Sequence, residues 1–140
     1  MVILAVILAL LPVPAAQADM LSMALKFNKM HERSMSFLGI NARRTSWCGA
    51  FLTYVAKHSS RQPPANPNMA VSWINFGRPV SPYFVRAGDV VVTRTGKRFH
   101  VSLFHHFDTG RRYVFLFGGN QSNRVQLSRY LASSIVAVRR

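Results

Sequence analysis

Residues 89–107, DVVVTRTGKRFHVSLFHHF, hold two runs of β-branched and aromatic side chains on either side of Gly96. Such side chains favour strands, and a glycine between them lets the chain reverse direction. Four runs of this type predict strands at residues 89–94, 99–107, 113–117 and 135–138. A second turn is predicted at 108–110. Because apolar residues follow one another without alternation, we expect both faces of the sheet to be covered.

The chain before Gly88 has helical periodicity instead. A first helical stretch, ending at Gly39, is indicated by apolar residues at helical spacing: Met20, Met23, Ala24, Phe27 and Met30. A second helix is predicted at 47–58, with Thr45 or Ser46 as its N-cap. A short third helix is predicted from Met69, Trp73 and Phe76, after a proline-rich connection. Helices first and an antiparallel sheet afterwards predict an α+β domain, with the helices packed on the sheet.

Composition limits the class of protein and of partner. The chain has 140 residues, of which 49% are hydrophobic, enough for one folded domain. Its 18 Lys and Arg against 4 Asp and Glu give a net charge of +14. This charge favours polyanions as partners: nucleic acid, anionic lipid or acidic cell-wall polymers. The basic residues are scattered and no nucleic-acid-binding motif occurs, so we expect no specific nucleic-acid partner.

The N-terminal residues have the pattern of an export signal. Residues 1–11 are apolar, and Ala16-Gln17-Ala18 follows as an A-x-A cleavage site. We therefore expect a signal peptide at 1–18, a mature domain at 19–140, a periplasmic or secreted location, and no stable membrane anchor. No Lys or Arg precedes the apolar run, so an uncleaved anchor or a buried helix is the alternative.

Cys48 is the single cysteine and stands at the predicted start of the second helix. The helix dipole and free backbone N–H groups there favour the thiolate, which is the reactive form of a thiol. With one cysteine the chain has no internal disulfide. The alternative is a buried cysteine that acts as a small hydrophobic residue.

Two later positions complete the pattern of a thiol hydrolase. His100 begins an apolar run, and Asn120 follows two glycines at the end of the next run. Adjacent antiparallel strands would place His100 and Asn120 side by side. A cysteine, a histidine and a polar residue that orients the imidazole are the parts of a nucleophilic thiol site.

The alternatives for these positions stay open. His100 could be a surface residue, and residues 118–120 only a turn. His106 has the same strand parity as His100 and is a minor candidate for the third role. His105 and His106 are expected on opposite faces, where they cannot easily share a metal. A thiol mechanism needs no metal, and we expect neither a metal nor a cofactor.

The remaining candidates have structural interpretations. We expect Asp89 to fix a turn, and His31 and His58 to lie on helix surfaces. Trp47, Phe51 and Trp73 are expected in the core rather than as sugar-stacking platforms.

Five motifs in order resemble the papain-like peptidoglycan hydrolases, the NlpC-type and CHAP cysteine peptidases and amidases. They lie at residues 45–51, 72–77, 87–92, 100–104 and 116–123. The likeness is closest to a small bacterial and phage branch with W-C-[AG]-A-F and G-G-N-Q motifs, and covers roughly residues 20–140. It implies a papain-like core, with Cys48 as nucleophile, His100 as base and Asn120 as the residue that orients the imidazole.

The resemblance also implies an activity. It predicts a monomeric, exported cysteine peptidase or amidase that hydrolyses a peptidoglycan amide, in the stem peptide or between muramic acid and L-Ala. The alternatives are a non-catalytic cationic wall-binding protein on the same fold, or a polyanion-binding protein in which Cys48 is merely buried. Phe99 and Ser102 stand where the family often has glycine, and Arg43 and Arg44 occupy the region of the papain-type glutamine. The second oxyanion donor is therefore unassigned.

Overall fold

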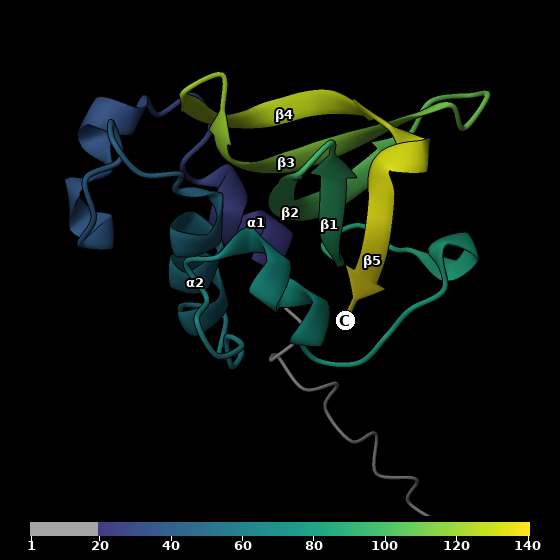
Figure 1. Cartoon of the computed structure of the whole chain (residues 1–140), viewed down its shortest axis with the longest axis horizontal. Helices are drawn as coiled ribbons and strands as arrows, with labels where there is room; N and C mark the ends of the chain where they lie inside the picture. The colour runs from purple at the N-terminus through teal and green to yellow at the C-terminus, as the bar shows by residue number, and fades with distance from the viewer. Residues whose placement is uncertain (1–19) are drawn as a thin grey trace, which may run out of the picture.

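A five-stranded antiparallel sheet, with the order β4-β3-β2-β1-β5, forms the centre of the computed structural model, which describes residues 20–140 (Figure 1). The strands are β1 (Val90–Thr95), β2 (Arg98–Phe107), β3 (Tyr113–Gln121), β4 (Arg124–Leu131) and β5 (Ile135–Arg139). Two α-helices, α1 (Met20–Leu25) and α2 (Cys48–Lys57), precede the sheet. The predicted α+β class is confirmed, and the predicted signal peptide at 1–18 lies outside the described residues.

Short 3-10 helices connect these elements. They are η2 (Glu32–Ser34), η3 (Ser36–Leu38), η4 (Ala70–Asn75), η5 (Pro82–Phe84) and η6 (Ala132–Ser134). The predicted first helix is much shorter than expected, since α1 ends at Leu25 and Gly39 closes η3 in a left-handed conformation, with φ of 73°. The predicted third helix is the 3-10 helix η4. No helix within residues 20–140 is long and apolar enough to cross a bilayer.

All four predicted strands are present, but β4 was not predicted. Its sequence alternates polar and apolar residues, and Val125 is its single fully buried side chain. Ser122 and Asn123 connect β3 to β4 with φ of 53° and 59°, the left-handed pair that a two-residue hairpin turn requires. The period-two alternation from Arg124 onward was the available signal.

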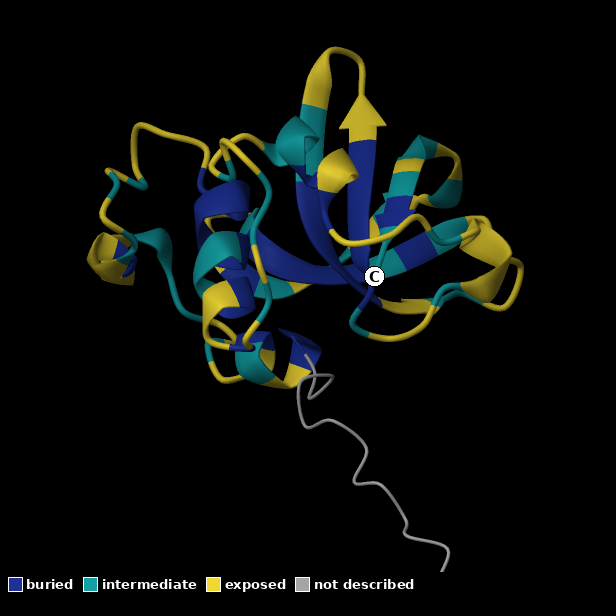
Figure 2. Ribbon diagram, turned by 90° about the horizontal axis from the view of Figure 1, so that it is seen from below, coloured by how far each residue is buried: buried dark blue, intermediate teal, exposed yellow. Residues whose placement is uncertain are grey.

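Both faces of the sheet are covered, as the sequence predicts. Val90 and Val92 pack into the larger core, which contains α1, α2 and η4, together with Trp47, Phe51 and Trp73. Val91 packs on the other face, in a smaller cluster with Phe104, Val114, Leu116 and Val138. Buried residues accordingly follow the central strands and the adjoining side of α2 (Figure 2).

The start of α2 is held by packing rather than by a side-chain cap. Trp47 occupies the N-cap position without a side-chain capping hydrogen bond, so the prediction of Thr45 or Ser46 is wrong. The Trp47 indole is fully buried and fixes this residue in the core. A Cβ on Gly49 would lie 2.5 Å from the carbonyl oxygen of Pro67, so the proline-rich loop crosses directly over the first helical turn.

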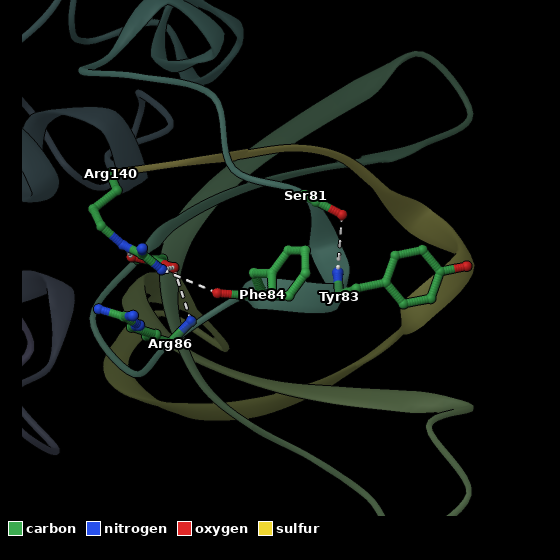
Figure 3. A network of polar contacts seen from close by, with 6 residues as sticks. Ser81, Tyr83, Phe84, Arg86 and Arg140 are labelled. Carbon is green, nitrogen blue, oxygen red and sulfur yellow. Dashed lines mark hydrogen bonds and ion pairs between the residues drawn. The ribbon is translucent and has the colours of Figure 1, made fainter.

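Asp89 fixes the turn that leads into β1, as expected. Its carboxylate accepts the backbone N–H of Arg86 at 2.8 Å and pairs with the Arg140 guanidinium at 2.7 Å. Arg140 also donates to the carbonyl oxygen of Phe84, and the Ser81 hydroxyl accepts the N–H of Tyr83 (Figure 3). This network joins η5 to the end of β5.

Candidate active site

Cys48 is the first residue of α2, and its thiol interacts with the imidazole of His100 on β2. The cysteine is only 2% exposed. α2 packs against β2 and β3, which brings the helix N-terminus to the middle of the sheet. The structure therefore brings together the predicted thiol and the predicted imidazole, 52 positions apart in the chain.

The surroundings of Cys48 stabilise its thiolate. Burial by itself raises the pKa of the Cys48 thiol. A side-chain hydrogen bond and the charge of His100, the backbone N–H of Val101 and the Ser46 hydroxyl all lower it. These interactions outweigh burial and bring the pKa of Cys48 from 9.0 to about 7.

The pKa of His100 moves in the opposite direction. Burial lowers it, but the hydrogen bond and the charge of Cys48, together with the hydrogen bond that the imidazole donates to Gln121, raise it above its ordinary value. The two shifts favour the same state, a thiolate beside an imidazolium. That pair combines a nucleophile with a proton donor near neutral pH.

Gln121 fixes the orientation of the imidazole. Its Oε1 lies 2.9 Å from His100 Nε2, while its Nε2 donates to the carbonyl oxygens of Leu116 and Gln126 at 3.0 and 2.7 Å. Because the amide nitrogen donates to two acceptors, Oε1 must accept a hydrogen bond from the N–H of His100 Nε2. His100 Nδ1 is then the ring nitrogen that remains for the thiol.

Asn120 does not make the contact with His100 that the resemblance assigns to it. Its Nδ2 donates instead to Ser46 Oγ at 3.2 Å, and Ser46 Oγ lies 3.8 Å from Cys48 Sγ. The register of β3 and β4 shifts between Gly118 and Gln121, and Asn120 has φ of 57°. This irregularity exchanges the directions of neighbouring side chains, so Gln121 rather than Asn120 reaches the imidazole.

The two glycines before Asn120 belong to β3, which excludes the alternative that they form only a turn. A Cβ on Gly119 would lie 2.6 Å from the Trp47 ring and 2.8 Å from the Cβ of Phe51. A Cβ on Gly118 would lie 2.7 Å from the Cβ of Ser102. The glycines therefore permit α2, with Cys48, to approach the sheet closely.

Tyr130 covers the other side of the imidazole. Its ring stacks on His100 at 5.4 Å between centroids, with 20° between the planes. Burial and the charge of Cys48 raise the pKa of its hydroxyl, so Tyr130 stays neutral. Sequence reasoning missed this residue because it belongs to the unpredicted strand β4.

A cavity of about 250 Å³ opens beside His100, and we call it the His100 pocket. It is lined by Ser46, Thr93, Thr95, Arg98, Phe99, His100, Asn120 and Tyr130. A larger hollow of about 560 Å³ lies along α2, between Phe37 and Met69, and includes neither Cys48 nor His100. We assign the site to the smaller pocket because His100 lines it, together with Ser46, whose hydroxyl oxygen lies 3.8 Å from the Cys48 sulfur.

The other histidines lie outside this pocket. His105 and His106 do not point to opposite faces, because a register shift between Phe104 and His106 brings their Nδ1 atoms to 2.7 Å. His106, the minor candidate for the third role, stacks on Phe115. Residues 20–140 contain no cluster of three side chains suited to a metal.

The two helix-surface candidates are peripheral. His58 is exposed and stacks on Tyr54 at the end of α2. His31 precedes η2, where its Nδ1 accepts the N–H of Arg33.

Comparison with known proteins gave no relative. No family model matches the chain, and neither the curated proteins nor the solved structures include a significant match.

Proposed function

We propose that the protein is a cysteine peptidase or amidase with a papain-like core. The observation that carries the proposal is the pairing of Cys48, at a helix N-terminus, with an imidazole whose second nitrogen is fixed by Gln121. Cys48 acts as nucleophile and His100 as general acid and base. Gln121 takes the positioning role that the family resemblance gives to Asn120.

The reaction follows from the protonation states of the pair. The Cys48 thiolate attacks the amide carbonyl carbon, and the C–N bond breaks as His100 donates its proton to the leaving amine. A water molecule then attacks the thioester, its proton passes to His100, and Cys48 leaves as a thiolate. The products are a carboxylic acid and an amine, and the thiolate–imidazolium pair is regenerated.

The developing oxyanion has two donors in this scheme. The backbone N–H of Cys48 lies at the helix start, where no intrahelical acceptor exists for it. The second donor is the Asn120 amide, which lines the His100 pocket. It donates a hydrogen bond to the Ser46 hydroxyl, whose oxygen lies 3.8 Å from the Cys48 sulfur. Asn120 therefore acts on the substrate rather than on His100.

Peptidoglycan is the substrate that fits the whole chain best. A net charge of +14 favours an anionic polymer, and the resemblance over residues 20–140 is to wall hydrolases. The apolar run and A-x-A site at 1–18 favour export to the periplasm or beyond, where the wall lies. The bond cut is an amide of the stem peptide or the muramoyl-L-Ala bond, and the protein works as a monomer.

One observation favours a second candidate. Cys48 is only 2% exposed, which suits a cationic wall-binding protein that has kept the fold without turnover. This candidate predicts binding to peptidoglycan with no released fragments.

Digestion of purified peptidoglycan separates the two candidates. The purified full-length protein and its Cys48→Ala variant are incubated with the same sacculi, and the released fragments are identified by mass spectrometry. New fragments from the unaltered protein alone would support hydrolysis and identify the bond. Equal fragments from both proteins, or none from either, would refute the catalytic role of Cys48.

A further inference from the structure

The His100 pocket has the charge of a site for an anion. None of its eight lining residues is acidic, and Arg98 adds a permanent positive charge beside His100. Ser46, Thr93, Thr95 and Asn120 add hydroxyl and amide groups that can donate hydrogen bonds. Arg98 and His100 are two residues apart on β2, so their side chains leave the same face of the strand.

Arg98 has no carboxylate partner within the part of the chain that the structure describes. The single ion pair among residues 20–140 joins Asp89 to Arg140. Asp108 accepts the N–H of Tyr113 at the next hairpin. The Arg98 side chain is also exposed, so its guanidinium is available to a ligand.

The neighbouring arginine differs from Arg98 in this respect. Arg94 donates from Nε to the carbonyl oxygen of Gly96 at 2.8 Å, and its guanidinium lies 5.4 Å from the centre of the Phe99 ring. Arg94 therefore stabilises the β1–β2 hairpin. Arg98, on the other strand of that hairpin, is the arginine that lines the pocket.

Arg98 is also close enough to affect the reacting pair. Its charge lowers the pKa of His100, in opposition to the interactions that raise it. An anion bound to Arg98 would therefore lie near the scissile bond and would offset this unfavourable charge. Because the Arg98 side chain is long, its guanidinium would bind the ligand at the mouth of the pocket.

We propose that Arg98 forms a carboxylate-binding subsite, so that the site selects amides in a peptide with a free carboxylate beside the scissile bond. The guanidinium fork matches a carboxylate with two parallel hydrogen bonds, which a neutral amide cannot reproduce. This inference rests on the proposed function, and it narrows the substrate class to acidic peptides. Stem peptides with free carboxyl groups belong to that class, and their amidated forms do not.

The test compares one muropeptide preparation before and after carbodiimide-catalysed amidation, which converts its carboxylates to primary amides. Kinetics are measured for the unaltered protein, Arg98→Gln, Arg98→Lys and the control Lys97→Gln. The Lys97→Gln substitution removes one positive charge, as Arg98→Gln does, but Lys97 lies at the tip of the hairpin and does not line the pocket. The unaltered protein and Lys97→Gln should prefer the free acid.

Arg98→Gln should raise KM for the free acid about tenfold or more, with little change in kcat, and should leave the amidated substrate unaffected. Arg98→Lys should recover part of the loss, because it restores the charge without the fork. An equal loss on both substrates, or an equal loss in Lys97→Gln, would overturn the subsite.

A binding measurement keeps this test separate from the proposed function. Calorimetric titration with the free-acid muropeptides is carried out on the Cys48→Ala variant and on the double variant Cys48→Ala, Arg98→Gln. The affinity of the double variant for these muropeptides should be lower. If no protein turns over either substrate but this difference persists, hydrolysis fails and the subsite stands. If binding is the same with and without Arg98, the subsite is refuted.

Discussion

Gln121 and Asn120 are neighbours in the chain with different hydrogen-bond partners, and this difference is the basis for the separate roles that we propose for them. Gln121 is 2% exposed and has all its polar atoms engaged, whereas Asn120 reaches the pocket. Sequence reasoning selected Cys48 and His100 as candidates because a thiol at a helix start and a histidine at a strand start are local signals, and the structure places the two residues together. It gave the third role to Asn120 from the family resemblance and from the expected pairing of adjacent strands. The register shift between Gly118 and Gln121, which redirects these side chains, has no local sequence signal beyond the two glycines.

This division predicts different effects on the imidazole. Gln121→Ala removes the hydrogen bond that raises the pKa of His100, so that pKa should fall, with a loss of about 1–3 kcal/mol of stability from the unpaired carbonyls. Asn120→Ala should leave the pKa of His100 unchanged and lower kcat. NMR titration of the His100 ring measures the pKa directly. If the pKa of His100 fell in Asn120→Ala and not in Gln121→Ala, the proposed roles of the two residues would have to be exchanged.

The contact between α2 and β3 determines where the thiol lies. The sequence predicts α2 and four of the five strands, because each has a strong run of side chains. It does not predict β4, because the apolar residues of this strand alternate with polar ones and form no continuous run. It also does not predict the N-cap of α2, where the packing of Trp47 replaces a side-chain hydrogen bond. Burial in three dimensions decides both, and no single segment encodes it.

Substitution of one glycine tests this contact. Gly119→Ala places a methyl group 2.6 Å from the Trp47 ring, so the free energy of unfolding should fall by about 1–3 kcal/mol. Urea denaturation measures the change. The control is Gly110→Ala, whose Cβ would meet no atom within 4 Å and which should alter stability by no more than about 0.5 kcal/mol. Equal effects of the two substitutions would show that α2 does not pack on β3 at Gly119.

The charge of the whole molecule favours binding to an anionic surface independently of catalysis. Eighteen basic residues against four acidic ones are spread along the chain, and three of the acidic side chains lie among the described residues. Such an excess attracts polyanions over a distance that salt shortens. Neither the sheet nor the pocket is required for this attraction, so binding alone is no evidence of hydrolysis.

Binding should therefore depend on salt and not on Cys48. Cosedimentation with purified sacculi should decrease as sodium chloride increases, and it should be equal for the unaltered protein and Cys48→Ala. Uncharged chitin serves as the control matrix and should retain little protein at any salt concentration. Retention that is insensitive to salt would show that shape or apolar contact, rather than charge, holds the protein on the wall.

The pH dependence of Cys48 alkylation by iodoacetamide tests most directly whether the thiol and the imidazole act together. The thiolate is the reactive form, so the rate should fall as the pH drops through the pKa of Cys48, with a midpoint at about 7. In His100→Ala, only the backbone N–H of Val101 and the Ser46 hydroxyl remain to oppose the rise in the pKa of Cys48 that burial causes. The midpoint of the alkylation rate should therefore move to higher pH. A slow rate in both proteins, or a midpoint that His100→Ala leaves unchanged, would mean that Cys48 is only a buried side chain.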